Sequence, residues 1–193
     1  MSSPRRPHRT QGRLPYRKRF VVATEGIKTE REYLALINRE RITVNWVRPD
    51  SSNPMGVLKA MKRHIEKEPL RRGDEAWIVI DRDHWAETEL NDVASWANSQ
   101  PNHGMALSNP KFEYWMLLHF EDAKGVSTSY EIKNKLRQYL PSYVKQVAPS
   151  DFSEENIARA IVRAKSQDDN THDWPKSPGQ TTVYRLIERM LEA

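Results

Sequence analysis

Residues 77–85 read WIVIDRDHW, an apolar run that ends in two aspartates separated by one arginine. An unbroken apolar run of this kind is typical of a strand that is buried on both faces of a parallel sheet. The charges at its end need water, a partner or a metal ion. Asp81 and Asp83 repel each other unless a cation lies between them. The stretch therefore raises the question of what the end of this strand holds.

The segments around this run alternate between the patterns of strands and helices. Strands are predicted at 19–24, 42–47, 76–81 and 104–109. Helices are predicted from 29, from 54, and at 86–98, 112–120, 129–140, 153–166 and 182–192. The alternation predicts an α/β fold, a Rossmann-like parallel four-stranded sheet with helices on both faces. Residues 19–120 would form the α/β core and residues 121–193 a helical extension of the same domain.

Composition limits the class of protein. The 193 residues are 37% hydrophobic and 30% charged, which suits one globular domain of ordinary size. No stretch approaches the roughly 20 apolar residues that span a bilayer, and we expect no membrane association. The chain contains no cysteine, which excludes disulfides and thiolate metal sites and fits a cytoplasmic protein.

Positive charge is concentrated at the N-terminus. The net charge is +5, yet residues 1–19 contain seven basic residues and no acid, so that the remainder is close to neutral. We expect residues 1–18 to form a disordered basic arm that contacts the phosphates of nucleic acids, although a solvated tail is an equal alternative. The basic residues concerned are Arg5, Arg6, Arg9, Arg13, Arg17, Lys18 and Arg19.

Three predicted strands end in polar residues: Glu25-Gly26, Asp81-Arg82-Asp83 and Ser108-Asn109. Sites in open α/β sheets form beyond the carboxyl ends of the strands. Side chains two apart on an extended segment point to the same side, so Asp81 and Asp83 should face one point. Glu25 joins them if the first and third strands are neighbours. Hard carboxylate oxygens of this kind suit Mg²⁺ or Mn²⁺, and we expect a metal site here.

At this point the sequence resembles a family. Glu-Gly after the first strand and Asp-x-Asp after the third are marks of the Toprim fold, which topoisomerases, primases and the overcoming-lysogenisation-defect nucleases contain. Four blocks resemble the RloB-like proteins more specifically, and the third is the most specific. They are EGIKTEREYL (25–34), IVIDRDHW (78–85), SNPKFEYWMLLHF (108–120) and SPGQTTVYRLIERML (177–191).

The resemblance implies roles for individual residues. Glu25 matches the Toprim glutamate, a metal ligand or general base, and Asp81 and Asp83 match the metal-binding pair. Glu30 resembles the second acid of the nuclease branch, although it lies five residues after Glu25 where about four are usual. Glu113 matches the RloB-like pattern, without an assigned role, and is a further candidate ligand.

The resemblance also implies a metal-dependent reaction on the phosphodiester bonds of DNA or RNA, possibly tRNA. Its setting would be anti-phage or abortive-infection defence, with an ATPase partner. Lys28 is a candidate for neutralising charge in the transition state, and a solvated lysine is the alternative. Two rival functions remain: a haloacid-dehalogenase-type phosphatase, in which Asp-x-Asp closes the first strand instead, and a non-catalytic nucleic-acid-binding or regulatory subunit.

Several other features are better explained as ordinary structure. The histidines lack the spacing of a transition-metal site, and the acidic loop 168–173 reads as solvated turns. Phe112, Trp115 and Met116 are expected in the core. The basic side of the helix from 54 is usually a solvated face, with phosphate binding as the alternative; it contains Lys59, Lys62, Arg63 and Lys67.

Overall fold

The computed structural model describes residues 17–38, 40–141, 149–168 and 171–193. Its strands are β1 (Lys18–Thr24), β2 (Ile42–Val47), β3 (Glu75–Asp81), β4 (His103–Asn109) and β5 (Gln180–Thr181). Its helices are α1 (Thr29–Leu34), α2 (Pro54–Lys67), α3 (Glu87–Ala97), α4 (Phe112–Leu117), α5 (Ser129–Tyr139), α6 (Glu154–Gln167) and α7 (Val183–Leu191), with a 3-10 turn at Pro149–Asp151. The predicted strands and helices therefore correspond closely to those observed.

The described strands form one sheet with the order β2-β1-β3-β4-β5. The first four are parallel, as predicted, and β1 and β3 are neighbours. The prediction of four strands is wrong, because β5 pairs antiparallel with β4. Two residues give no detectable periodicity, and β5 lies inside a segment that reads as a loop.

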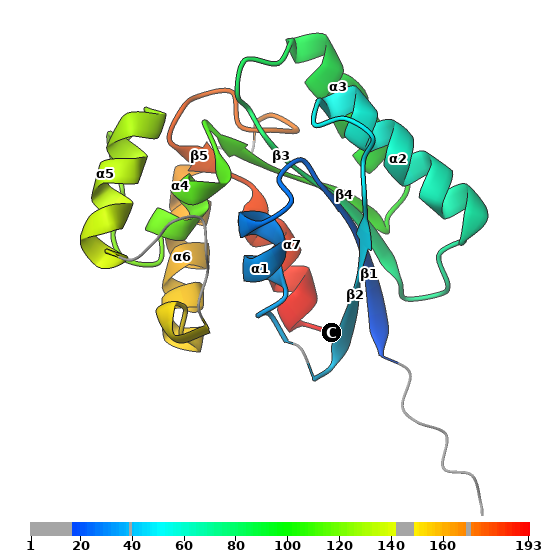
Figure 1. Ribbon diagram of the computed structural model, residues 1–193, viewed down its shortest axis with the longest axis horizontal. Helices are drawn as coiled ribbons and strands as arrows, with labels where there is room; N and C mark the ends of the chain where they lie inside the picture. The colour runs from blue at the N-terminus through cyan, green and yellow to red at the C-terminus, as the bar shows by residue number, and fades with distance from the viewer. Residues whose placement is uncertain (1–16, 39, 142–148, 169–170) are drawn as a thin grey trace, which may run out of the picture.

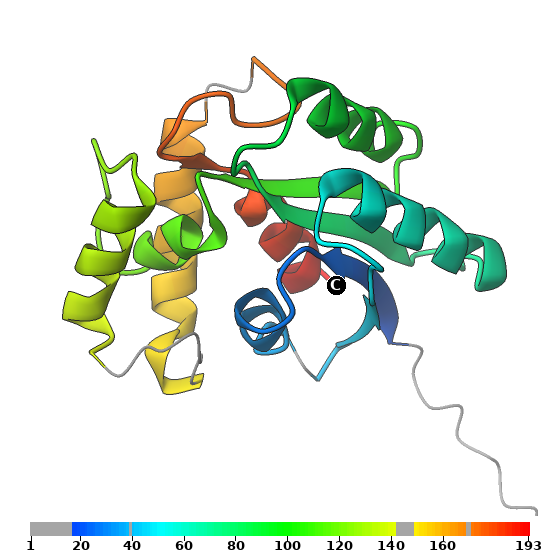
Figure 2. The same ribbon diagram turned by 45° about the horizontal axis from the view of Figure 1, so that its top comes forward.

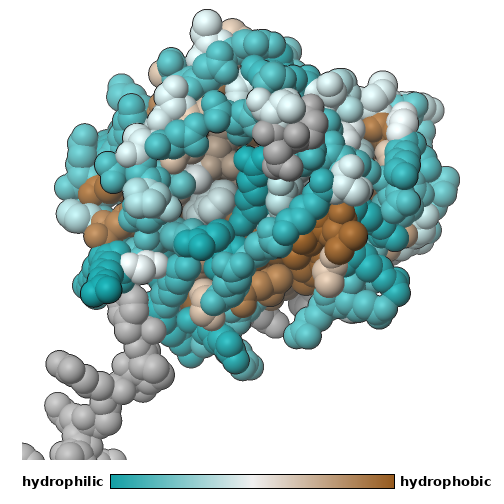
Figure 3. All heavy atoms as spheres, turned by 180° about the vertical axis from the view of Figure 1, so that it is seen from behind, coloured by the Kyte–Doolittle hydropathy of each residue, from teal (hydrophilic) through white to brown (hydrophobic). Residues whose placement is uncertain are grey.

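Helices cover both faces of the sheet (Figures 1 and 2). On one face α2 and α3 pack over Val21, Ile78 and Leu107. On the other face α1, α4, α6 and α7 pack over the alternate side chains, Val22 and Val79 among them. Seen from behind, the surface is mostly hydrophilic and is interrupted by a hydrophobic area (Figure 3). The strand alternation thus assigns each side chain to one of two cores.

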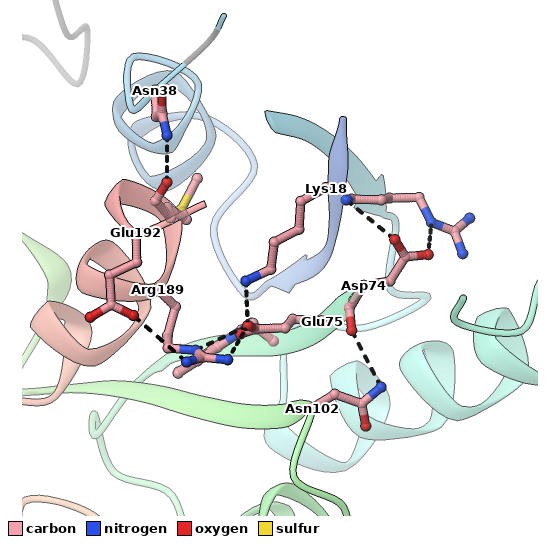
Figure 4. Close-up of polar contacts among 10 residues, drawn as sticks. Lys18, Asn38, Asp74, Glu75, Asn102, Arg189 and Glu192 are labelled. Atoms are coloured by element: carbon pink, nitrogen blue, oxygen red, sulfur yellow. Dashed lines mark hydrogen bonds and ion pairs between the residues drawn. The ribbon is translucent and has the colours of Figure 1, made fainter. Parts of the chain in front are cut away.

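The amino edge of the sheet carries a buried ion-pair network (Figure 4). Glu75 is 3% exposed and accepts hydrogen bonds from Arg189 on α7 and from the Trp77 indole. The Nζ of Lys18 lies 2.8 Å from the Glu75 carboxylate. Burial alone would raise the pKa of Glu75, but the hydrogen bonds from Arg189, Lys18 and Trp77 outweigh it, and the pKa is lowered.

Two of the basic residues predicted to contact phosphates, Lys18 and Arg19, belong to the folded sheet instead. β1 begins at Lys18, the last residue of the expected arm, and Arg19 pairs with the buried Asp74. Both side chains are held at the amino edge of the sheet, about 20 Å of strand away from Glu25. The expected contacts of Arg5, Arg6, Arg9 and Arg13 lie outside the described residues.

An aromatic cluster connects α1 with α4. The Nδ1 of His119 lies 3.0 Å from the Trp115 carbonyl oxygen, so Nδ1 carries the proton. Its Nε2 accepts a hydrogen bond of 2.9 Å from the Tyr33 hydroxyl. Phe112 and Trp115 pack edge-on against the Tyr33 ring. His119, Phe112 and Trp115 are thus structural, as expected, and they fix the helices that carry Glu30 and Glu113 relative to each other.

This buried histidine predicts an acid-dependent loss of stability. Burial lowers the pKa of His119 to about 4. A lowered histidine pKa stabilises the fold above the ordinary value near 6.5, and that contribution is lost as the pH falls towards 4. The free energy of unfolding should fall by up to about 3 kcal/mol over this range. Denaturant titrations should show that His119→Gln removes this dependence and that Tyr33→Phe retains it; an unchanged acid dependence in His119→Gln would contradict the assignment.

Candidate active site

The carboxyl edge of the sheet holds a pocket of about 490 Å³. Its walls come from the segment after β1, from the loop after β2, from the end of β3 and from the start of α4. It is lined by Glu25, Gly26, Ile27, Lys28, Thr29, Glu30, Ser52, Asp81, Lys111 and Glu113. Sequence reasoning placed the site at this edge of the sheet, and the pocket is found there.

Asp81 is the last residue of β3 and lies on the face covered by α1 and α4. Along β3, Trp77 and Val79 point to this face, and Asp81 follows the same alternation. Burial raises the pKa of Asp81 well above its ordinary value, and the charges of Glu30, Glu113 and Glu25 raise it further. Four carboxylates from different segments therefore act on one another in this pocket.

Glu25 is tied to the neighbouring strand. Its backbone N–H donates to the Val79 carbonyl at 3.1 Å, and its carboxylate accepts from the Asp81 N–H at 3.3 Å. Burial raises the pKa of Glu25 to about 7, opposed by the Asp81 N–H and assisted by the charge of Asp83. A carboxylate with this pKa exchanges protons near neutral pH, which is the range in which a general base operates.

Asp83 lies differently from the prediction. The strand ends at Asp81, and Asp83 has a φ of 37°, so the extended geometry that would align the two side chains does not persist. The Asp83 side chain is 59% exposed, its carboxylate lies 3.5 Å from His84 Nδ1, and it does not line the pocket. The Arg82 guanidinium lies over the Trp174 ring and donates a hydrogen bond to the Trp85 carbonyl oxygen. The charge of Asp83 reaches the pocket by raising the pKa of Glu25.

Lys28 and Lys111 bring positive charge to the pocket. Lys28 is exposed and makes no ion pair with any residue that the structure describes. Lys111 is 25% exposed, and its Nζ lies 3.9 Å from the Glu113 carboxylate. Sequence reasoning proposed Lys28 but missed Lys111 and Ser52. Lys111 lies within the quoted block 108–120, and Ser52 follows β2, the one parallel strand whose end was not considered.

Gly26 allows the Glu30 carboxylate to lie against the backbone. A Cβ atom at position 26 would collide with both carboxylate oxygens of Glu30, which are at the end of a flexible side chain. This explains why a glycine follows Glu25: the second acid reaches back over it from α1.

We expect Gly26→Ala to move the Glu30 carboxylate at little cost in stability. The free energy of unfolding should change by less than about 1 kcal/mol, because the end of a flexible side chain can shift. Isothermal titration calorimetry with Mn²⁺ should show weaker binding both in this variant and in Glu30→Gln. The double variant should bind no more weakly than Glu30→Gln alone, since both changes remove the same interaction. Additive losses would contradict this explanation.

The donor atoms of the pocket are of the kind that bind a hard metal ion. Carboxylate oxygens are the ligands that Mg²⁺ and Mn²⁺ prefer, and a divalent cation would offset the burial and the mutual repulsion that raise the pKa values of Asp81 and Glu25. The chemistry of the donors therefore fits. Their arrangement is looser, because no three His, Asp or Glu side chains in the described ranges are placed so as to hold one ion together.

None of the helices in the described part of the chain is long and apolar enough to cross a membrane.

The acidic residues of the loop at 168–173 that the structure describes make contacts within the fold. Of the acidic loop at 168–173, residues 169 and 170 lie outside the described residues. The Asp168 carboxylate accepts hydrogen bonds from Tyr184 and Arg185, and Asp173 accepts from Asn98.

Comparison with known proteins gives one finding. A search of curated proteins and a search of solved structures each found no match. The family model described as RloB-like protein matches residues 20–190. This match covers the sheet, the pocket residues and α7, and it extends over most of the chain. The chain therefore belongs to the RloB-like protein family.

Proposed function

We propose that this protein is a Toprim-type, metal-dependent nuclease that cleaves the phosphodiester bonds of nucleic acid. The observation that carries the proposal is the meeting of Glu25, Glu30, Asp81 and Glu113 in one pocket with two lysines. Carboxylates that repel one another, beside cations that do not neutralise all of them, are typical of sites that bind a divalent cation and a phosphate together.

In this proposal Asp81 is the central ligand of Mg²⁺ or Mn²⁺, with Glu25, Glu30 and Glu113 as the further candidates. The ion, when bound, would polarise the scissile phosphate and steady the leaving oxygen. Asp83, 59% exposed and outside the pocket lining, would adjust the charge of Glu25 instead of filling the primary site.

The chain's own groups account for the remaining tasks. Lys28 and Lys111 would bind the phosphate oxygens and stabilise the charge that develops on them. Glu25, with its pKa raised to about 7, would accept a proton from the attacking water when it does not bind the metal. The scissile bond of a nucleic-acid strand would enter the pocket that these groups line.

The experiment is cleavage of a panel of plasmid, single-stranded DNA, total RNA and tRNA with Mg²⁺ or Mn²⁺. Wild type and Asp81→Asn are compared, with Asp92→Asn on the exposed side of α3 as the matched control. Cleavage by wild type and by Asp92→Asn, but not by Asp81→Asn, is expected. Cleavage that is the same in all three proteins would point to a contaminating nuclease and overturn the assignment.

A second candidate function is a non-catalytic nucleic-acid-binding or regulatory subunit of a defence complex. The looser arrangement of the carboxylates favours it. Calorimetry with Mg²⁺ and Mn²⁺ separates the two functions, because a site that has lost its activity through decay should bind neither ion. Absence of metal binding together with binding of the nucleic-acid panel would favour the subunit.

The biological setting is part of the proposal. Membership of the RloB-like family supports a role in anti-phage or abortive-infection defence with an ATPase partner. We propose a cytoplasmic location, because the chain contains no cysteine and its substrate would be DNA or RNA inside the cell. Co-expression with a neighbouring ATPase gene and measurement of phage plaque numbers tests this setting.

A further inference from the structure

The outer side of α2 carries a group of exposed lysines. Lys59, Lys62 and Lys67 are exposed, and none of them makes an ion pair with a residue in the described ranges. Arg63 on the same side is paired with Asp50, and Glu66 is the acid of this side within the helix. We call Lys59, Lys62 and Lys67 the α2 lysine face. Its charge is available to a partner from outside the chain.

The helix that bears this face begins beside the pocket. Ser52 lines the pocket, and the next residue, Asn53, caps α2 by accepting a hydrogen bond from the Gly56 N–H at 2.7 Å. Met55 in the first turn is 39% exposed. Residues three or four apart share one side of a helix, so Met55, Lys59 and Lys62 form a row that leads away from the pocket.

The neighbouring helix carries the opposite charge. α3 packs beside α2 on the same face of the sheet (Figure 1). It contains Glu87, Glu89 and Asp92 and no basic residue, and of these acids Glu87 is paired with Lys176. A polyanion that approaches this side of the molecule is repelled by α3 and attracted by the α2 lysine face. We therefore expect a polyanion to approach the pocket along α2 and not along α3.

We propose that the α2 lysine face binds the phosphodiester backbone of the nucleic acid whose scissile bond enters the pocket. The role of this face in catalysis rests on the proposed nuclease function, but its binding to nucleic acid is measured without cleavage. Each lysine contacts one phosphate and releases its counterions, so the face contributes affinity without reading sequence. Met55 lies between the lysines and the pocket and packs against a sugar or base.

The test is the salt dependence of binding. Fluorescence anisotropy of labelled single-stranded DNA, duplex DNA and RNA is measured in EDTA at several salt concentrations, in the Asp81→Asn background, so that cleavage plays no part. Each lost phosphate contact lowers the slope of log K against log salt by about 0.7 for a single strand and about 0.9 for a duplex. The Lys59→Gln, Lys62→Gln, Lys67→Gln variant should therefore lose about 2 to 2.7 from the slope.

A matched variant removes the same charge elsewhere. Lys124→Gln, Lys133→Gln, Arg137→Gln changes three exposed basic residues on and before α5, away from the pocket. It should lower affinity only slightly and leave the slope within about 0.5 of wild type. Equal slopes in the two triple variants would overturn the proposal. A lack of cleavage by wild type would instead overturn only the nuclease assignment, because the slope is measured without cleavage.

Discussion

Asp81→Asn is expected to stabilise the metal-free protein while it removes cleavage. Burial and the charges of Glu30, Glu113 and Glu25 hold the pKa of Asp81 well above its ordinary value, so the ionised carboxylate destabilises the folded chain. The neutral, isosteric asparagine removes this repulsion. The free energy of unfolding at pH 8 in EDTA should rise by about 1–2 kcal/mol, and the rate of cleavage should fall roughly a thousand-fold.

The sign of the pH dependence separates this effect from ordinary repacking. A raised carboxyl pKa contributes stability that is present below the ordinary value near 3.8 and is lost as the pH rises through the raised value. The gain in Asp81→Asn should therefore be absent near pH 4 and present at pH 8. Denaturant titrations at both pH values check this, with Asp92→Asn as the control that should not differ from wild type. A loss of stability at pH 8 would show that the carboxylate is satisfied by the fold itself.

Added metal should reverse the order of stability. An ion that binds only the folded state raises the melting temperature by an amount that grows with its concentration. Mg²⁺ or Mn²⁺ should stabilise wild type and leave Asp81→Asn almost unchanged. The same two proteins thus report both the repulsion within the pocket and the ion that relieves it.

Glu75→Gln should destabilise the fold strongly. Removal of one partner from a buried ion pair costs about 3–5 kcal/mol. We expect about 2–4 kcal/mol here, because Arg189 is 49% exposed and regains water when the pair is broken. Chemical denaturation at pH 7 measures the loss. Glu155→Gln on α6 is the control, since both partners of its pair with Arg159 are exposed, and its effect should stay below about 0.5 kcal/mol.

The loss should shrink in acid. The lowered pKa of Glu75 means that its contribution is present above the ordinary value near 4.5 and disappears as the pH falls through the lowered value. Wild type and Glu75→Gln should therefore converge below pH 4. Cleavage by the remaining folded Glu75→Gln protein should equal that of wild type, because the network and the pocket lie at opposite edges of the sheet.

The strands and helices were predictable because their signals are local and strong. The apolar run at 76–81 and the alternation of patterns on both sides of it require a parallel sheet covered on two faces, and four of the five strands follow from this. β5 was not predictable, since its two residues are defined only by pairing with β4. The partners of Glu75 were also hidden, because Lys18 and Arg189 lie 57 and 114 residues away from it.

The candidate site was predictable to the level of the strand ends. Glu25 and Asp81 meet because β1 and β3 are neighbours, a condition that sequence reasoning had to assume. The position of Asp83 was not predictable, since a backbone φ of 37° leaves no trace in the residue pattern. Lys111 was missed because one lysine among many carries no signal until the fold places it beside carboxylates.

The position of α7 has a consequence for the order of folding. This helix, at residues 183–191, packs directly on β4. It supplies Leu186, Ile187 and Met190 to the core on the same face of the sheet as the Asp81 side chain. These residues follow β4 by more than 70 positions in the chain, so the two elements meet only when a long loop closes. Until then one face of the sheet lacks the part of its cover that α7 supplies. Pulse-labelled hydrogen exchange during refolding should accordingly show α7 and β4 gaining protection together.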